Sequence, residues 1–228
     1  MAQAGLHGIV GVAVRKWMPK KEWLLLGVVL GSLFPDLDYI AVAFAVMMQQ
    51  SAAGLQYTFT HSIFTILVVV LLFHLISLAT KNNKWSNLGL GFGIGILLHI
   101  LLDLVIWFKG VKLFWPFHYE LNFWSWLVVP NWLDILLRAG EFLAFGLYFT
   151  LLAFVAAKQK TNEDYAPKLR SWANSQYALF FLFTFLFFFP QKNTMAIYSA
   201  LYLLALFFAI IITLRMKQTI EQSTNKSK

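Results

Sequence analysis

The chain has 228 residues, of which 60% are hydrophobic and only 12% are charged, and this balance excludes a soluble domain with an ordinary charged surface. The absence of cysteine excludes disulfide frameworks, thiolate metal sites and cysteine nucleophiles, so a bound metal would need imidazole and carboxylate ligands. The formal net charge of +8 lies in short basic clusters between apolar stretches. We therefore expect membrane lipids as partners and no nucleic acid.

The first apolar run, residues 3–14, is too short to cross a bilayer. It precedes a basic cluster at residues 15–21, which is the reverse of the order in a cleavable signal peptide. The run therefore predicts a retained half-membrane or interfacial helix, and it carries the first histidine, His7.

Six later apolar stretches have about the length that a hydrocarbon core of roughly 30 Å requires, although the fifth is short and rich in phenylalanine. They are residues 23–48, 62–80, 88–108, 137–157, 176–189 and 195–214. The sequence therefore predicts an all-α fold, a polytopic membrane helix bundle with about six transmembrane helices plus the short N-terminal half-helix.

The composition divides the chain into four parts. Residues 1–116 hold the short helix, the first three spans and most of the polar residues within apolar sequence. Residues 117–136 belong to a tryptophan-rich stretch typical of a membrane interface. Residues 137–215 hold the last three spans, and we expect residues 216–228 to form a disordered cytoplasmic tail.

The basic residues also predict the orientation. If the spans alternate and residues 15–21 are cytoplasmic, 14 of the 18 basic residues fall on the cytoplasmic side. The positive-inside rule therefore favours cytoplasmic positions for the N-terminal basic loop and the C-terminal tail.

Two carboxylates interrupt the first span. Asp36 and Asp38 flank Leu37 directly after Pro35, which removes a helix donor and clashes with the preceding turn. A charged side chain costs on the order of 3 kcal/mol at the centre of a bilayer helix, so each one needs a partner or a purpose. A kink with carboxylates paired to basic residues is the plainer interpretation, but no Lys or Arg lies at that depth.

Histidines lie at similar depths. His99 and Asp103 are four residues apart in the third span and therefore share one helix face, where they could hold one metal or merely brace the helix. His61 lies at the outer mouth of the second span. A rise of about 1.5 Å per residue brings Asp36, His99 and Asp103 to similar levels, with His7 below and His61 above.

The predicted metal ligands are gathered from four segments of the chain: His7, Asp36, Asp38, His61, His99 and Asp103. Asp134 and Glu141 are secondary candidates at the start of the fourth span. His74 faces another direction on its helix, and His118 and Glu120 are expected to be solvated. Imidazole with carboxylate suits one or two divalent ions, zinc foremost, with manganese or iron as alternatives.

Several motifs in this half of the chain occur in a fixed order. They are Gly5-Leu6-His7, Pro35-Asp36-Leu37-Asp38, Thr60-His61-Ser62, and a run from Gly95 through His99, Asp103 and Gly110 to Phe114-Trp115-Pro116. The set resembles the YdjM-like family of inner-membrane-associated metal-dependent hydrolases over about half the chain, and implies the bacterial inner membrane. One departure stands before Thr60, where the family commonly has His-Arg-Gly and this chain has Gln56-Tyr57-Thr58-Phe59.

The resulting hypothesis is a membrane-embedded hydrolase that cleaves a lipid-borne ester or phosphodiester through metal-activated water. Asp38 and His61 are the expected catalytic residues, with Asp38 acting as base or bridging a second metal. A cation or proton transporter is one alternative, since broken helices with carboxylates form such sites. A non-catalytic membrane scaffold with a structural metal site is the other.

Overall fold

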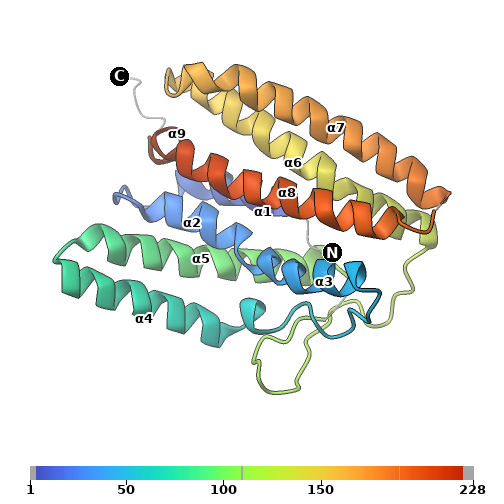
Figure 1. Cartoon of the computed structure of the whole chain (residues 1–228). Coiled ribbons are helices and arrows are strands. Elements are labelled where there is room, and N and C mark those ends of the chain that lie inside the picture. The colour runs from blue at the N-terminus through green and yellow to red at the C-terminus, as the bar shows by residue number, and fades with distance from the viewer. Residues whose placement is uncertain (1–3, 109, 190, 223–228) are drawn as a thin grey trace.

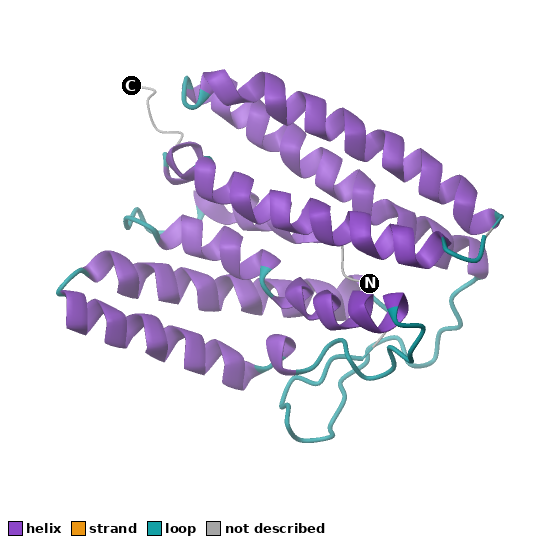
Figure 2. Cartoon of the chain, in the orientation of Figure 1, coloured by secondary structure: helices purple, strands orange, loops and turns teal. Residues whose placement is uncertain are grey.

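The computed structural model describes residues 4–108, 110–189 and 191–222. Figure 2 shows helices throughout this part of the chain, which contains no strand and only one isolated bridge, between Val111 and Leu121. The predicted all-α bundle is confirmed.

Most helices follow one another in short connections, whereas longer segments precede α4 and α6 (Figure 1). The α-helices are α1 (Ala4–Ala13), α2 (Leu24–Leu33), α3 (Tyr39–Met47), α4 (Ile63–Thr80), α5 (Asn83–Ile106), α6 (Asn131–Gln159), α7 (Ala166–Phe188), α8 (Thr194–Arg215) and α9 (Lys217–Glu221). The 3₁₀ turns are η1 (Val14–Lys16), η2 (Pro35–Asp38), η3 (Phe59–His61) and η4 (Glu163–Tyr165).

Five segments of the described chain are long and apolar enough to cross a membrane, and they match the predicted spans one to four and six. They are Leu24–Met47, Ile63–Thr80, Asn83–Ile106, Asn131–Gln159 and Thr194–Arg215. The predicted fifth span lies in the second half of α7, whose 23 residues begin with a polar stretch. Helix α7 packs along the length of α6 (Figure 1). Together with the five candidate spans, α7 gives the described bundle six long helical segments.

Two helices extend past the segment boundaries that the sequence predicts. Helix α6 begins at Asn131, with Pro130 at its N-cap position, so residues 131–136 of the predicted interfacial segment form its first turns. The tail does not become disordered at residue 216, because α9 follows α8 directly and buries Met216 and Ile220 against the bundle. Residue 3 and residues 223–228, which belong to predicted segments, lie outside the described residues.

The exposed side chains support a bilayer as the solvent. Along α4, Leu67, Val68 and Leu78 are 60%, 64% and 62% exposed. A row of large apolar side chains in water would be an aggregation site, whereas lipid tails cover it without cost.

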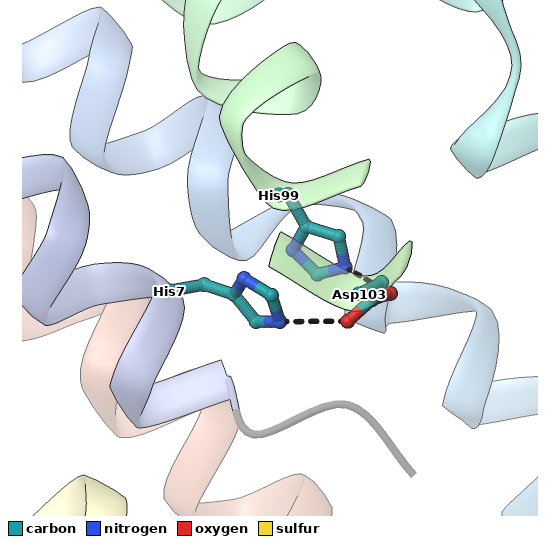
Figure 3. Close-up of side chains that lie close together, drawn as sticks. All are labelled: His7, His99 and Asp103. Carbon is teal, nitrogen blue, oxygen red and sulfur yellow. Dashed lines mark ion pairs between the residues drawn. The ribbon is translucent and has the colours of Figure 1, made fainter. Parts of the chain in front are cut away.

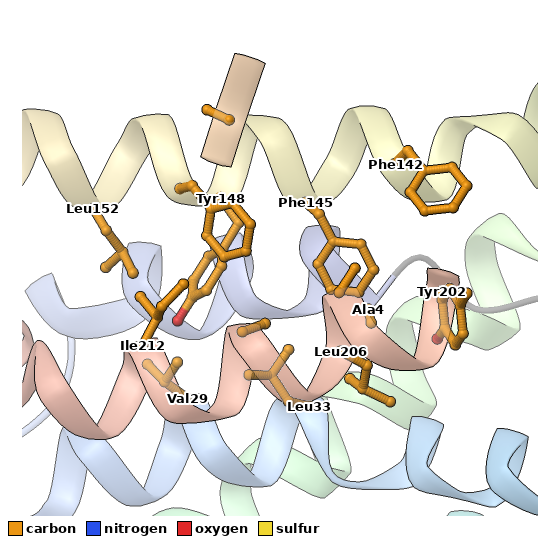
Figure 4. Close-up of a cluster of buried hydrophobic side chains, with 14 of the residues drawn as sticks. Ala4, Val29, Leu33, Phe142, Phe145, Tyr148, Leu152, Tyr202, Leu206 and Ile212 are labelled. Atoms are coloured by element: carbon orange, nitrogen blue, oxygen red, sulfur yellow. The ribbon is translucent and has the colours of Figure 1, made fainter. Parts of the chain in front are cut away.

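The half-helix α1 is ten residues long, about 15 Å, and lies between α2 and α6. Figure 4 shows the apolar cluster around it, to which α1, α2, α6 and α8 contribute side chains such as Ala4, Leu33, Phe145 and Leu206. The second half of the chain therefore encloses the helix that carries His7.

Helices α2 and α5 pack closely through small residues. Gly27 and Gly31 on α2 face Gly91 and Gly95 on α5, two G-x-x-x-G pairs. A Cβ on Gly95 would overlap the backbone carbonyl of Val28, so only glycine permits this approach. The close packing brings the face of α5 that bears His99 against the end of α2.

Candidate metal centre

The structure brings all six predicted ligands into one buried cluster. The histidines His7, His61 and His99 are 2%, 1% and 0% exposed, and Asp36 and Asp103 are 4% and 0% exposed. The contributing elements are α1 with His7, η2 with Asp36 and Asp38, η3 with His61, and α5 with His99 and Asp103.

Asp103 lies at the centre of this cluster. Its Oδ1 is 3.1 Å from Nε2 of His7, and its Oδ2 is 3.2 Å from Nε2 of His99 and 3.4 Å from Nε2 of His61. Figure 3 shows the His7 and His99 rings side by side with Asp103 at their edge, the ring centroids 3.6 Å apart. Three imidazoles therefore converge on a single carboxylate.

The end of α2 orients one of these rings. The last carbonyls of a helix lack intrahelical donors, and the Ser32 carbonyl accepts a hydrogen bond from Nδ1 of His99 at 2.7 Å. A neutral His99 with its proton on Nδ1 presents the lone pair of Nε2 to the cluster. Metal-binding histidines are oriented by this kind of hydrogen bond.

The helix break at Pro35 directs the two η2 carboxylates to different places. Asp36 points inward, with Oδ1 4.0 Å from Nε2 of His99. Asp38 lies at the outer edge of the cluster, where its Oδ2 accepts the backbone N–H of Tyr57 at 2.9 Å and lies 3.5 Å from Nδ1 of His61. Asp38 thus meets the cluster through His61.

The turn around His61 is fixed from both sides. Thr60 Oγ1 lies 3.0 Å from Nδ1 of His61, within hydrogen-bond distance. Ser62 Oγ accepts the N–H of Phe64 and so caps α4, and it donates to the carbonyl of Trp115 at 3.1 Å. Thr60 therefore supports the ring, and Ser62 supports the backbone that carries it.

Sequence reasoning missed Tyr57 as a member of the site. Its ring centroid is 4.9 Å from that of His61, and its buried hydroxyl has no hydrogen-bond partner in the part of the chain that the structure describes. Burial, with the nearby carboxylates Asp103 and Asp36, raises the pKa of this hydroxyl well above its ordinary value, so it remains a donor. The one feature of the sequence that could have indicated Tyr57 as part of the site is its position four residues before His61.

The remaining candidates lie outside the cluster. Asp134 forms an ion pair with Arg138 at 2.7 Å, and Glu141 is buried on α6 without an ion pair in the described chain. His118 and Glu120 are exposed, as expected, and His74 is exposed on α4, away from the cluster.

The donor atoms suit a divalent cation. One atom each from His7, His99 and Asp103 lie within 4.8 Å of one another. Both His7 nitrogens, both Asp103 oxygens and Oδ2 of Asp36 are buried and have no hydrogen-bond partner among the described residues, because the short contacts between them are not aligned as hydrogen bonds. No Lys or Arg among the described residues forms an ion pair with the cluster. A cation would compensate these buried groups.

A comparison with protein families matches most of the chain. Neither the curated proteins nor the solved structures contain a match. A family model described as YdjM inner membrane protein matches residues 3–218. This range extends beyond the motifs recognised in the first half and includes α6, α7 and α8. The chain therefore belongs to the YdjM inner membrane protein family.

Proposed function

We propose that this protein is a metal-dependent hydrolase of the inner membrane that cleaves a lipid-borne ester, with phosphodiesters as the first class to test. The observation that carries the proposal is the convergence of three imidazoles with Asp36 and Asp103 at one buried point, with Asp38 at its edge and without a basic partner among the described residues. Intramembrane ionisable groups are costly, and such a set is retained for function.

In this proposal His7, His99 and Asp103 hold the first ion, zinc being the best match for nitrogen and oxygen donors in a small shell. His61 and Asp36 complete the shell or, with Asp38, hold a second ion. A divalent ion would supply Lewis acidity toward an ester oxygen and acidify a water molecule.

A lateral groove supports a substrate that carries lipid chains. It has a volume of 420 Å³, and apolar side chains dominate its lining. Asp38 and Thr60 lie at its inner wall, while Phe44 and Phe59 at its border are 58% and 48% exposed. An acyl chain from the bilayer could lie in this groove beside the Asp38 carboxylate.

A second, more polar hollow supports a charged headgroup on the same substrate. Its volume is 400 Å³, and Tyr57, Lys112, Glu120 and Asn122 contribute to its lining. Tyr57, which lines this hollow, has its ring against that of His61. An amphiphile with its chain in the groove and its headgroup toward Lys112 would bring an ester between them to the metal centre.

The direct test is elemental analysis of the purified protein, followed by hydrolysis assays on a panel of phospholipids in mixed micelles. We expect one or two equivalents of zinc, and hydrolysis that a chelator abolishes and zinc restores. Bound metal with no hydrolysis of any lipid would instead favour a structural metal site, which the near-complete burial of the ligands also suits. Metal flux in proteoliposomes without hydrolysis would favour a transporter.

The groove assignment predicts a specific defect. Ala41 is an exposed residue of the groove lining, so the indole of Ala41→Trp should fill the groove. Because the acyl chain of the substrate can then no longer bind there, turnover of long-chain substrates should fall at least about tenfold. Metal content and turnover of a short-chain soluble analogue should not change. Ala79→Trp, at an exposed position on α4, is the matched control. Equal activity of the two variants on long chains would exclude the groove as the substrate path.

A further inference from the structure

A basic hollow lies at the end of the bundle where α2 begins, whereas the metal centre lies where α2 ends. It has a volume of 590 Å³ and is enclosed by the segment between η1 and α2 and by α9. Four cationic residues contribute to its lining: Arg15, Lys16, Lys20 and Lys21.

The two acidic residues of the hollow are engaged elsewhere. Glu22 forms an ion pair with Lys84 at 2.7 Å. Glu221 accepts the backbone N–H groups of Trp23 and Leu26 at 3.1 and 2.7 Å, and so compensates the positive N-terminus of α2. Neither carboxylate is therefore free to neutralise the cations of the hollow.

The cations themselves lack partners in the described part of the chain. None of the four forms an ion pair there. Nη1 of Arg15 is buried and has no hydrogen-bond partner. A buried guanidinium donor without an acceptor is costly, and a phosphate is the anion whose geometry it matches best.

We propose that this hollow binds the phosphate group of an anionic phospholipid. Basic pockets between helices at the cytoplasmic face hold such headgroups, and the positive-inside bias predicts that face for residues 15–21. Trp17, next to Arg15, is 76% exposed, as is typical of an indole that lies at the level of lipid headgroups. This site is separate from the metal centre and does not depend on the hydrolase proposal.

The test compares ligands on the purified full-length protein in a neutral detergent. The three ligands are phosphatidylglycerol, phosphatidylcholine and inorganic phosphate. Binding of each is measured by native mass spectrometry and by the change in the melting temperature of the protein when the ligand is added. We expect phosphatidylglycerol to bind at least about tenfold more tightly than phosphatidylcholine, because only the former carries net negative charge. Binding of inorganic phosphate with equal affinity would identify a free phosphate as the ligand and overturn the lipid assignment.

Variants locate the site. The triple variant Arg15→Gln, Lys20→Gln, Lys21→Gln should lose the preference for phosphatidylglycerol, with affinity reduced at least about tenfold. The control is the triple variant Lys158→Gln, Lys160→Gln, Arg170→Gln, which removes the same amount of charge from exposed positions on the same predicted face. It should keep the preference for phosphatidylglycerol. The single variant Lys20→Gln, at an exposed position, should bind phosphatidylglycerol about threefold more weakly than the wild type. Equal losses in the triple variant and its control would overturn the proposal.

Discussion

Replacement of Asp103 by Asn is expected to remove the metal from the purified protein. Asp103 is the carboxylate that all three histidines approach, at 3.1 to 3.4 Å, and an amide of the same shape binds a divalent cation far more weakly. Even an outer-shell partner is worth roughly 10- to 100-fold in metal affinity, so we expect a loss of about 100-fold or more. Elemental analysis after desalting measures the metal that remains bound, and a zinc titration measures the loss of affinity.

The matched control is Asp134→Asn. Asp134 is also a carboxylate near a helix end, but its partner is Arg138 and it lies outside the cluster. This variant should retain its metal, and both should elute as folded protein with the helical circular dichroism of the wild type. Wild-type protein that binds no divalent metal, or Asp103→Asn protein with unchanged metal content, would contradict the assignment of the centre.

The proximity of the six candidate ligands could be predicted from the sequence because the bilayer makes such residues conspicuous. His99 and Asp103 stand in an otherwise apolar span, and helical geometry alone places them on one face. Pro35 marks the break that directs Asp36 inward. The rise per helical residue then gives the depth of each side chain in the membrane. The agreement of these depths was sufficient to predict that segments distant in the sequence meet at one site.

Other features depend on contacts that no single segment encodes. The partnership of Tyr57 with Asp38 and His61 arises from a loop conformation, with Tyr57 at φ +57°, that pattern and periodicity do not report. The helical tail around Ile220 depends on tertiary burial, which overrode a polar local composition.

The glycine pairs on α2 and α5 show a third kind of limit. Each G-x-x-x-G is visible in the sequence, but which helices meet through it is a property of the assembled bundle. The same holds for His7, whose depth depended on the direction of α1. The close α2–α5 contact and the enclosure of α1 by α6 and α8 together set the distances at the centre.

Replacement of Asp38 by Asn is expected to separate metal binding from turnover. Asp38 lies at the inner wall of the lateral groove and 3.5 Å from His61, but it makes no contact with His7 or Asp103 in the described structure. If it accepts a proton during hydrolysis, its loss should reduce turnover by roughly 10²- to 10⁴-fold. Asn can still accept the Tyr57 N–H through its amide oxygen, so metal content should stay close to that of the wild type.

The readouts are metal per chain and the turnover number on the lipid that the panel identifies. Asp164→Asn is the control, because Asp164 is an exposed carboxylate in η4 that lines neither the groove nor the polar hollow and lies outside the histidine cluster. Full activity of the Asp38→Asn protein would exclude Asp38 as the base. Loss of metal together with activity would instead make Asp38 a ligand, the bridging role that a second ion requires, and would shift the proton acceptor to His61 or another group of the centre.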